Sequence, residues 1–184
     1  MLDEVNTTGT ERRNLILIGF MGTGKTTVGR KVAKSLGFRF VDTDQLIVKR
    51  TGKSIPRIFA EDGEEAFREI ESEVLRKCVE RSGQVVSTGG GIVTVAKNRD
   101  LLKKAGFVIW LRASPDSIYA RVRRSGNRPL LRTENPRETI AAMLESRNPL
   151  YEETRDLVIT TDDLTLEETS HGVTESARIE LGAA

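Results

Sequence analysis

Gly19-Phe20-Met21-Gly22-Thr23-Gly24-Lys25-Thr26 decides the fold of this chain, because it has the G-x-x-x-x-G-K-[ST] spacing of a phosphate-binding loop. The apolar run 15–18 in front of it has the length and branching of a buried strand. Behind it, apolar residues recur at helical spacing, at Val28, Val32, Ala33 and Leu36. Strand, glycine loop and helix follow one another as the motif requires, so the sequence predicts a nucleotide site at this turn.

Each residue type in the loop has a physical task. The glycines let successive backbone N–H groups turn toward phosphate oxygens, and the helix N-terminus adds partial positive charge. Lys25 can reach the β- and γ-phosphates, and the Thr26 hydroxyl can ligate Mg²⁺. The predicted nucleotide contacts are Gly22, Thr23, Gly24, Lys25, Thr26 and Thr27.

The bulk composition limits the classes of function. The 184 residues suit one domain with one core, and 38% hydrophobic with 30% charged residues is typical of a folded, soluble chain. A net charge of +2 gives no broad surface for nucleic acid, and no apolar run is long enough to span a membrane. The single cysteine, Cys78, excludes an internal disulfide, and its helical spacing predicts a packed thiol. We therefore expect a cytoplasmic enzyme that binds neither nucleic acid nor a membrane.

Apolar strand-like runs alternate with helical patterns, which predicts an α/β fold with a parallel sheet. The expected strands are 15–18, 39–42, 85–87, 107–111 and 157–160. The expected helices are 25–36, 44–51, 62–81, 97–105, 114–124 and 136–147, and Thr165 with Glu168 predicts a capping box for a final helix. Residues 1–13 are expected to form a loose tail.

Two stretches do not fit as plain connections. Residues 43–71 form a helical insert between the second and third strands. Residues 125–135 are rich in Arg, Gly, Asn and Pro, and a mobile arginine-rich segment beside a phosphate loop is typical of a lid over ATP. A nucleic-acid patch is the alternative for this segment, but interleaved aromatic residues are absent from it.

Asp42-Thr43-Asp44 closes the second strand. Ligands of open α/β sheets bind outside the carboxyl ends of the strands, so both carboxylates should face the site. Phosphoryl transfer needs support for a metal and a group that orients the attacking hydroxyl, and two aspartates can divide these tasks. A turn that caps the next helix is the alternative explanation.

Three further features are ambiguous when each is taken alone. Arg68, in a helix dense with charge, is either a solvated residue or a guanidinium fork for a carboxylate. Gly89-Gly90-Gly91 after the third strand indicates close approach by a ligand or by a neighbouring element. Arg147 near a helix end is often only a partner of the helix dipole.

Taken together and in order, these segments resemble shikimate kinase over about residues 14–165. The elements that carry the resemblance are the phosphate loop, Asp42-Thr43-Asp44, Phe67-Arg68-Glu69-x-Glu71, Thr88-Gly89-Gly90-Gly91, Arg128-Pro129-Leu130-Leu131 and Arg147-Asn148-Pro149-Leu150-Tyr151. The resemblance implies a P-loop kinase fold like that of nucleoside monophosphate kinases, with a five-stranded parallel sheet flanked by helices. It also implies a core domain over 14–168, with a substrate-binding insert at about 43–71 and a lid at about 125–135, followed by a helix end and tail at 169–184.

The resemblance also implies a role for individual residues. Arg68 and Arg147 match the two arginines that hold the shikimate carboxylate, and bidentate pairs suit a planar carboxylate. Asp44 matches the group that holds a ring hydroxyl and positions or deprotonates the nucleophile, and Asp42 matches the support of the Mg²⁺ shell. The implied catalytic residues are Lys25, Asp44 and Arg128; the implied substrate contacts add Gly89, Gly90 and Gly91 to Asp44 and the two arginines, and the implied metal residues are Thr26 and Asp42.

The implied reaction transfers the γ-phosphoryl group of ATP to the 3-hydroxyl of shikimate, giving shikimate 3-phosphate and ADP, a step toward chorismate and the aromatic amino acids. Arg128 matches the lid arginine that reaches the ATP phosphates.

A monomer is expected. The alternatives are a gluconate kinase-like or nucleoside monophosphate kinase, or a non-catalytic nucleotide-binding regulator. One departure from the family pattern is Leu164, where a polar residue near the adenine is common.

Overall fold

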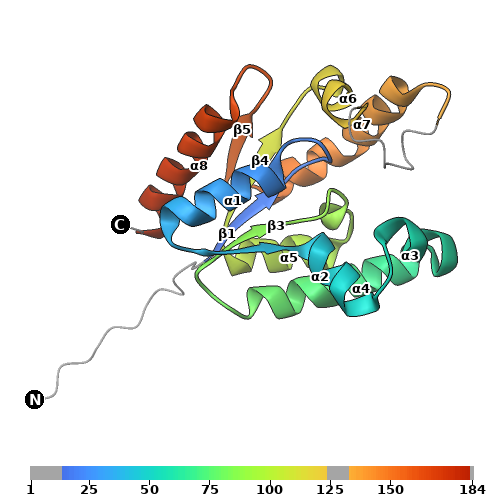
Figure 1. Ribbon diagram of the computed structural model, residues 1–184, viewed down its shortest axis with the longest axis horizontal. Coiled ribbons are helices and arrows are strands. Elements are labelled where there is room, and N and C mark those ends of the chain that lie inside the picture. The colour runs from blue at the N-terminus through green and yellow to red at the C-terminus, as the bar shows by residue number, and fades with distance from the viewer. Residues whose placement is uncertain (1–13, 124–132, 183–184) are drawn as a thin grey trace, which may run out of the picture.

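A computed structural model describes residues 14–123 and 133–182, in which a parallel five-stranded sheet lies between two layers of helices (Figure 1). The strand order is β2-β3-β1-β4-β5, and all neighbours are parallel, so the carboxyl ends of the strands share one edge. The strands are β1 (Asn14–Ile18), β2 (Arg39–Asp42), β3 (Gln84–Ser87), β4 (Phe107–Arg112) and β5 (Leu157–Thr160).

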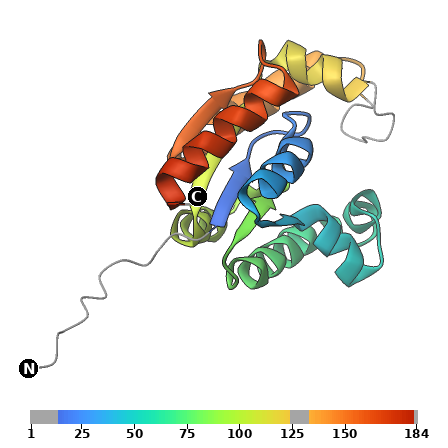
Figure 2. The same cartoon turned by 60° about the vertical axis from the view of Figure 1, so that its left-hand side comes forward.

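The helices divide between the two faces of the sheet, as the two views in Figures 1 and 2 show. On one face lie α1 (Lys25–Leu36) and α8 (Leu166–Leu181). On the other lie α4 (Gly63–Val79), α5 (Ala96–Ala105), α7 (Pro136–Thr154) and the short 3-10 helix η1 (Ile92–Thr94). The remaining helices, α2 (Thr43–Thr51), α3 (Ile55–Glu61) and α6 (Pro115–Val122), lie toward the ends of the sheet.

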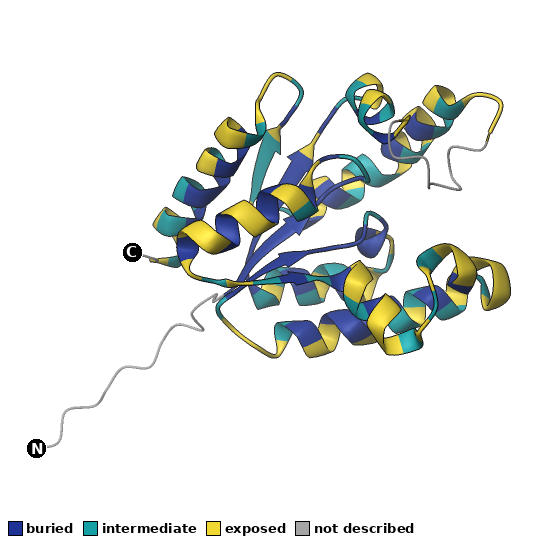
Figure 3. Ribbon diagram, in the orientation of Figure 1, coloured by how far each residue is buried: buried dark blue, intermediate teal, exposed yellow. Residues whose placement is uncertain are grey.

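Strand β1 is buried along its whole length (Figure 3). Its side chains alternate between the two layers. Leu15 and Leu17 pack against apolar residues of α1 and α8. Ile16 and Ile18 pack in the opposite cluster, which includes Tyr151 of α7. The run of apolar residues in front of the phosphate loop is therefore the centre of the sheet, as the sequence predicted.

Several expectations about the elements are confirmed, and others need correction. Cys78 is buried in the core, as expected. The insert contains a further helix, α3, which lies between the expected helices 44–51 and 62–81 and was not predicted. Helix α7 does not end at Arg147 but continues through Pro149 to Thr154. A proline inside a helix removes one backbone hydrogen bond, but the fully buried Tyr151 anchors the turn that follows it.

Some expectations concern residues outside the described ranges. They include the N-terminal tail at 1–13 and most of the expected lid, with Arg128.

Residues 169–181, expected as a helix end and tail, continue α8, which packs along α1. No helix in the described ranges is long and apolar enough to cross a membrane.

Asn14 ties together the amino-terminal end of the sheet. Its side-chain amide is buried at the start of β1 and donates to the carbonyls of Arg81 (2.8 Å) and Ala105 (3.3 Å). Its Oδ1 accepts a hydrogen bond from Gln84 N at 3.1 Å. One side chain thus joins the connections that lead into the two strands next to β1.

We predict that Asn14→Asp destabilises the fold by about 2–4 kcal/mol, because it replaces a buried donor to two carbonyls with a charge that faces them. Urea unfolding at neutral pH measures the effect. Asn135→Asp at the exposed start of α7 is the control, and its effect should stay within about 0.5 kcal/mol of zero. Equal stability of the two variants would mean that Asn14 does not hold the strand ends together.

Candidate functional site

The phosphate loop, residues 19–26, forms the turn between β1 and α1. Gly22 and Gly24 have positive φ values of 79° and 94°, a conformation that glycine adopts without a steric penalty. A Cβ on Gly22 would also lie 2.7 Å from Val122 Cγ1. The loop therefore has the glycines that its backbone course requires, and it leads directly into the N-terminus of α1.

Lys25 lies across this loop. Its side chain is buried, and its Nζ donates to the carbonyls of Gly19 (2.7 Å) and Phe20 (2.8 Å). Thr23 Oγ1 donates to the same Phe20 carbonyl at 2.8 Å. The ammonium group is thus fixed at the mouth of the loop, where it can neutralise charge on a bound phosphate.

Asp42 connects the loop to the end of β2. Its Oδ2 accepts a hydrogen bond from the Thr26 hydroxyl at 2.9 Å, and Ser87 Oγ lies 3.5 Å from that hydroxyl. Its Oδ1 accepts from the backbone N–H groups of Asp44 and Gln45 and so caps α2. The two explanations offered for the aspartates are combined in one carboxylate, since Asp42 both caps a helix and faces the phosphate loop.

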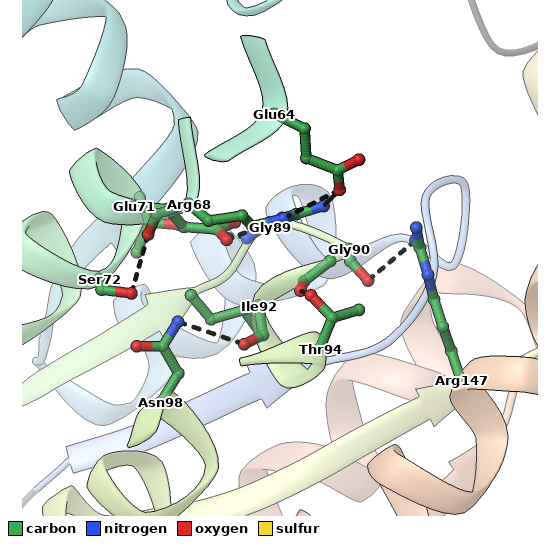
Figure 4. A network of polar contacts seen from close by, with 12 residues as sticks. Glu64, Arg68, Glu71, Ser72, Gly89, Gly90, Ile92, Thr94, Asn98 and Arg147 are labelled. Atoms are coloured by element: carbon green, nitrogen blue, oxygen red, sulfur yellow. Dashed lines mark hydrogen bonds and ion pairs between the residues drawn. The ribbon is translucent and has the colours of Figure 1, made fainter. Parts of the chain in front are cut away.

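Neighbouring groups closely approach the three glycines after β3, of which Figure 4 labels Gly89 and Gly90. A Cβ on Gly89 would lie 2.7 Å from Asp44 Oδ1 and 2.8 Å from Glu71 Oε1. A Cβ on Gly90 would lie 3.1 Å from the Met21 backbone nitrogen of the phosphate loop. At Gly91, a Cβ would lie 2.4 Å from Arg68 Nη1. We call residues 89–91 the glycine segment. Groups of the phosphate loop, α2 and α4 all lie next to it.

Arg68 reaches the glycine segment from α4 and is held there by two carboxylates (Figure 4). Its Nη1 lies 2.8 Å from Glu71 Oε2 and its Nη2 lies 3.1 Å from Glu64 Oε1. The side chain is only 16% exposed, so Arg68 is not a solvated residue, which was one of the two explanations for it. Glu71 is fully buried, and its second oxygen, Oε1, has no hydrogen-bond partner within the described part of the chain.

Arg147 approaches the same segment from α7 (Figure 4). Its Nη1 lies 3.4 Å from the Gly90 carbonyl oxygen, and its guanidinium lies over the Phe20 ring, 5.5 Å from the centroid. The two arginines therefore contact neighbouring glycines from different helices. A planar carboxylate could be held between two such guanidinium groups.

A cavity of about 320 Å³ lies beside these groups. Its lining joins loop residues to the ends of two other strands, and the residues are Met21, Gly22, Gly24, Lys25, Thr26, Thr27, Asp42, Asp44, Ser87, Thr88 and Gly90. Two hollows of about 730 Å³ on the outer surfaces of α4 are larger, but no residue of the phosphate loop or glycine segment lines them. The chemistry of the lining, rather than size, makes the smaller cavity the candidate site.

Nearly all residues expected at the site lie together in the structure. The exception is Arg128, which is outside the described residues. Leu164, expected near the adenine, is 40% exposed. Sequence reasoning gave no role to Ser87, although it ends a strand two residues before Gly89, at the edge where ligands bind. It also gave none to Glu71 and Tyr151, which belong to recognised motifs but whose contacts depend on the tertiary fold.

Comparisons with known proteins agree with this geometry. The family model for shikimate kinase matches residues 21–178. The shikimate kinase of Thermodesulfovibrio yellowstonii is 48% identical over 161 residues, which are 88% of this chain and 92% of the relative. That of Actinobacillus pleuropneumoniae serotype 5b is 46% identical over 83% of this chain and 88% of its own.

Solved structures give the same result. The structure of shikimate kinase from Acinetobacter baumannii in complex with shikimate is similar with a TM-score of 0.85 and 39% identity, over 92% of this chain and 93% of that one. A gluconokinase from Sinorhizobium meliloti, with a TM-score of 0.66 and 18% identity over 94% of this chain and 95% of that one, shares the fold.

The buried Glu71 carboxyl predicts a pH dependence of stability. Burial raises its pKa above the usual 4.5, although Arg68 and Arg147 act to lower that pKa. A group with a raised native pKa contributes its full stability below the unfolded pKa and loses it as the pH rises through the native pKa. The unfolding free energy of the wild type, minus that of Glu71→Gln, should therefore decrease as the pH rises above 4.5.

Urea unfolding at a series of pH values measures this difference. Glu69→Gln, on the exposed surface of the same helix, controls for the loss of a carboxylate. A difference that grows in favour of the wild type as the pH rises would mean that pairing with Arg68 outweighs burial.

Proposed function

The chain belongs to the shikimate kinase family, and from this premise we propose that it transfers the γ-phosphoryl group of ATP to the 3-hydroxyl of shikimate. The products are shikimate 3-phosphate and ADP. The observation that carries the proposal is that two guanidinium groups, those of Arg68 and Arg147, contact the glycine segment beside the cavity that a phosphate loop lines. The substrate of this enzyme needs both a carboxylate to be gripped and a hydroxyl to be phosphorylated.

On the phosphate side, we assign the contacts to the loop amides and to Lys25. The backbone from Gly22 to Thr27 would surround the β- and γ-phosphates, and the N-terminus of α1 adds favourable charge. Lys25 would exchange its two carbonyl partners for phosphate oxygens and offset the charge that develops during transfer. Arg128, outside the described residues, is assigned to the ATP phosphates by family likeness alone.

Thr26 and Asp42 would hold Mg²⁺. Both offer hard oxygen donors, and their oxygens lie 2.9 Å apart beside the loop. Mg²⁺ usually keeps several waters and takes few protein ligands, so a pair of oxygens fits better than a full protein cage. The ion supplies charge neutralisation on the phosphates when bound. Asp42 would keep its cap on α2 through Oδ1 while Oδ2 faces the metal site.

On the substrate side, Arg68 and Arg147 would hold the carboxylate, and the glycine segment would provide close backbone contact. Asp44 is the proposed partner of the reacting hydroxyl, because its carboxylate lies against Gly89 and lines the cavity next to the phosphate loop. It would position this hydroxyl or accept its proton. We further propose that residues 43–71 bind substrate, that 125–135 form a lid, and that the protein acts as a cytoplasmic monomer.

An assay that couples ADP release to a change in absorbance tests the function. Shikimate, gluconate and AMP are supplied in turn with ATP and Mg²⁺. The proposal expects turnover with shikimate alone. Turnover with gluconate or AMP instead would reassign the substrate, and no turnover with any acceptor would indicate a nucleotide-binding regulator.

Lys25→Met should reduce turnover by on the order of 10²-fold or more, because the transition state loses a charge partner. The fold should persist, as judged by circular dichroism. Lys34→Met, in the exposed last turn of the same helix, is the matched control and should keep wild-type turnover. If Lys25→Met turned over shikimate at nearly the wild-type rate, the ammonium group would have no part in transfer.

A further inference from the structure

Tyr151 is a buried residue that the proposed mechanism does not use. It lies in α7, one turn after Arg147, and its side chain is fully buried. Its ring stacks on that of Trp110 in β4, with centroids 5.5 Å apart. Packing explains the ring but not the hydroxyl, since a phenylalanine would fill the same space.

The hydroxyl of Tyr151 donates to the carbonyl oxygen of Gly90, the central residue of the glycine segment. The same carbonyl oxygen is 3.4 Å from Arg147 Nη1, so it has two donors from one helix. Burial raises the pKa of the tyrosine far above its usual value, which keeps the hydroxyl protonated and able to donate. One backbone carbonyl therefore connects the glycine segment to a residue of the proposed substrate grip.

The peptide between Gly90 and Gly91 needs such a fixing contact. Glycine has no Cβ to restrict its backbone, so a glycine segment keeps a single conformation only if other groups hold it. Because the peptide is planar and trans, a held Gly90 carbonyl also fixes the direction of the Gly91 N–H. The rest of the segment is held by similar bonds, from Gly89 N to Thr43 Oγ1 and from Thr94 Oγ1 to the Gly91 carbonyl.

Substrate binding would affect the two groups that donate to the Gly90 carbonyl differently. Arg147 must turn its guanidinium toward the substrate carboxylate, and its bond to the carbonyl is long. Gly90 is only partly exposed, so a carbonyl left without a donor would oppose that movement. Tyr151 cannot follow Arg147, because its ring is fixed between helix and sheet, so its hydroxyl stays on the carbonyl.

We propose that Tyr151 is a positioning residue for substrate binding: its hydroxyl holds the Gly90 carbonyl, which frees Arg147 for the carboxylate and keeps the glycine segment in its binding shape. This inference rests on the proposed function. It assigns to the tyrosine of the Arg147-Asn148-Pro149-Leu150-Tyr151 segment a task in recognising the acceptor, separate from its packing in the core.

Tyr151→Phe tests the proposal, because it removes the hydroxyl and keeps the ring. Losing this hydroxyl, which bonds the Gly90 carbonyl and also Arg147, should raise the KM for shikimate about fivefold to tenfold, with the KM for ATP nearly unchanged. Thr154→Val is the matched control. It removes another buried hydroxyl of α7, one that donates to the Leu150 carbonyl, and it leaves the glycine segment untouched. Thermal midpoints of both variants are measured in parallel.

The possible outcomes distinguish a failure of the role proposed for Tyr151 from a failure of the proposed function. Wild-type protein that phosphorylates shikimate, with Tyr151→Phe showing an unchanged KM, would overturn the tyrosine's role alone. The same rise in KM in Thr154→Val would overturn it as well, since the effect would then come from loosening α7. A wild type without shikimate turnover would instead overturn the proposed function.

A second measurement uses the unaltered protein, in case Tyr151→Phe does not fold. The chain has two tyrosines, so labelling their ring carbons allows the Tyr151 hydroxyl proton to be assigned by NMR. The proposal expects this proton to exchange slowly with water both before and after shikimate is added. Fast exchange after shikimate binds would mean that the hydroxyl has left the Gly90 carbonyl, which contradicts the proposal.

Discussion

The constraint on which the site depends is the absence of side chains at Gly89, Gly90 and Gly91. At these positions a single Cβ would come within 2.4–3.1 Å of groups that belong to α2, α4 and the phosphate loop. The sequence alone left open whether a ligand or a neighbouring element required the three glycines, and in the structure neighbouring elements approach all three closely. Because only backbone lies between them, the two proposed substrate arginines can lie close to the cavity that the phosphate loop lines.

The charged groups next to the glycine segment hold one another in position within the protein. Arg68 makes three hydrogen bonds to Glu64 and Glu71, and these fix its guanidinium over Gly91. A guanidinium has more N–H groups than these bonds use, so it can still donate to a substrate carboxylate. Its partner Glu71 is fully buried, where an ion pair contributes little net stability but its disruption is costly. We interpret the pair as a device that holds the arginine in position.

Much of this fold could be predicted from the sequence, because its signals are local. The phosphate loop identifies β1 and α1, and the alternation of apolar runs identifies the parallel sheet. Helix α3 was not predicted because seven residues carry too short a helical pattern, and α7 was ended too early because Pro149 is a local stop signal. The burial of Tyr151, which outweighs that signal, is a property of the assembled core.

The residues of the site could be predicted from the sequence, but the contacts between them could not. The motifs identify Lys25, Asp44 and the two arginines as candidates, and the structure brings these together with the glycine segment. They do not reveal that Asp42, rather than Asp44, caps α2, or that Ser87 lies beside the Thr26 hydroxyl. Such contacts join residues far apart in the chain, and their distances arise only when the strands align at one edge.

The most direct test of the account is a thermodynamic cycle on the substrate carboxylate. Calorimetry would measure the binding of shikimate and of its methyl ester to the wild type, Arg68→Ala and Arg147→Ala. In the wild type the ester should bind roughly 10- to 150-fold more weakly, as expected for lost charge-assisted hydrogen bonds, and in each variant this ratio should fall toward one. A ratio that stayed at the wild-type value in both variants would contradict the claim that these arginines hold the carboxylate.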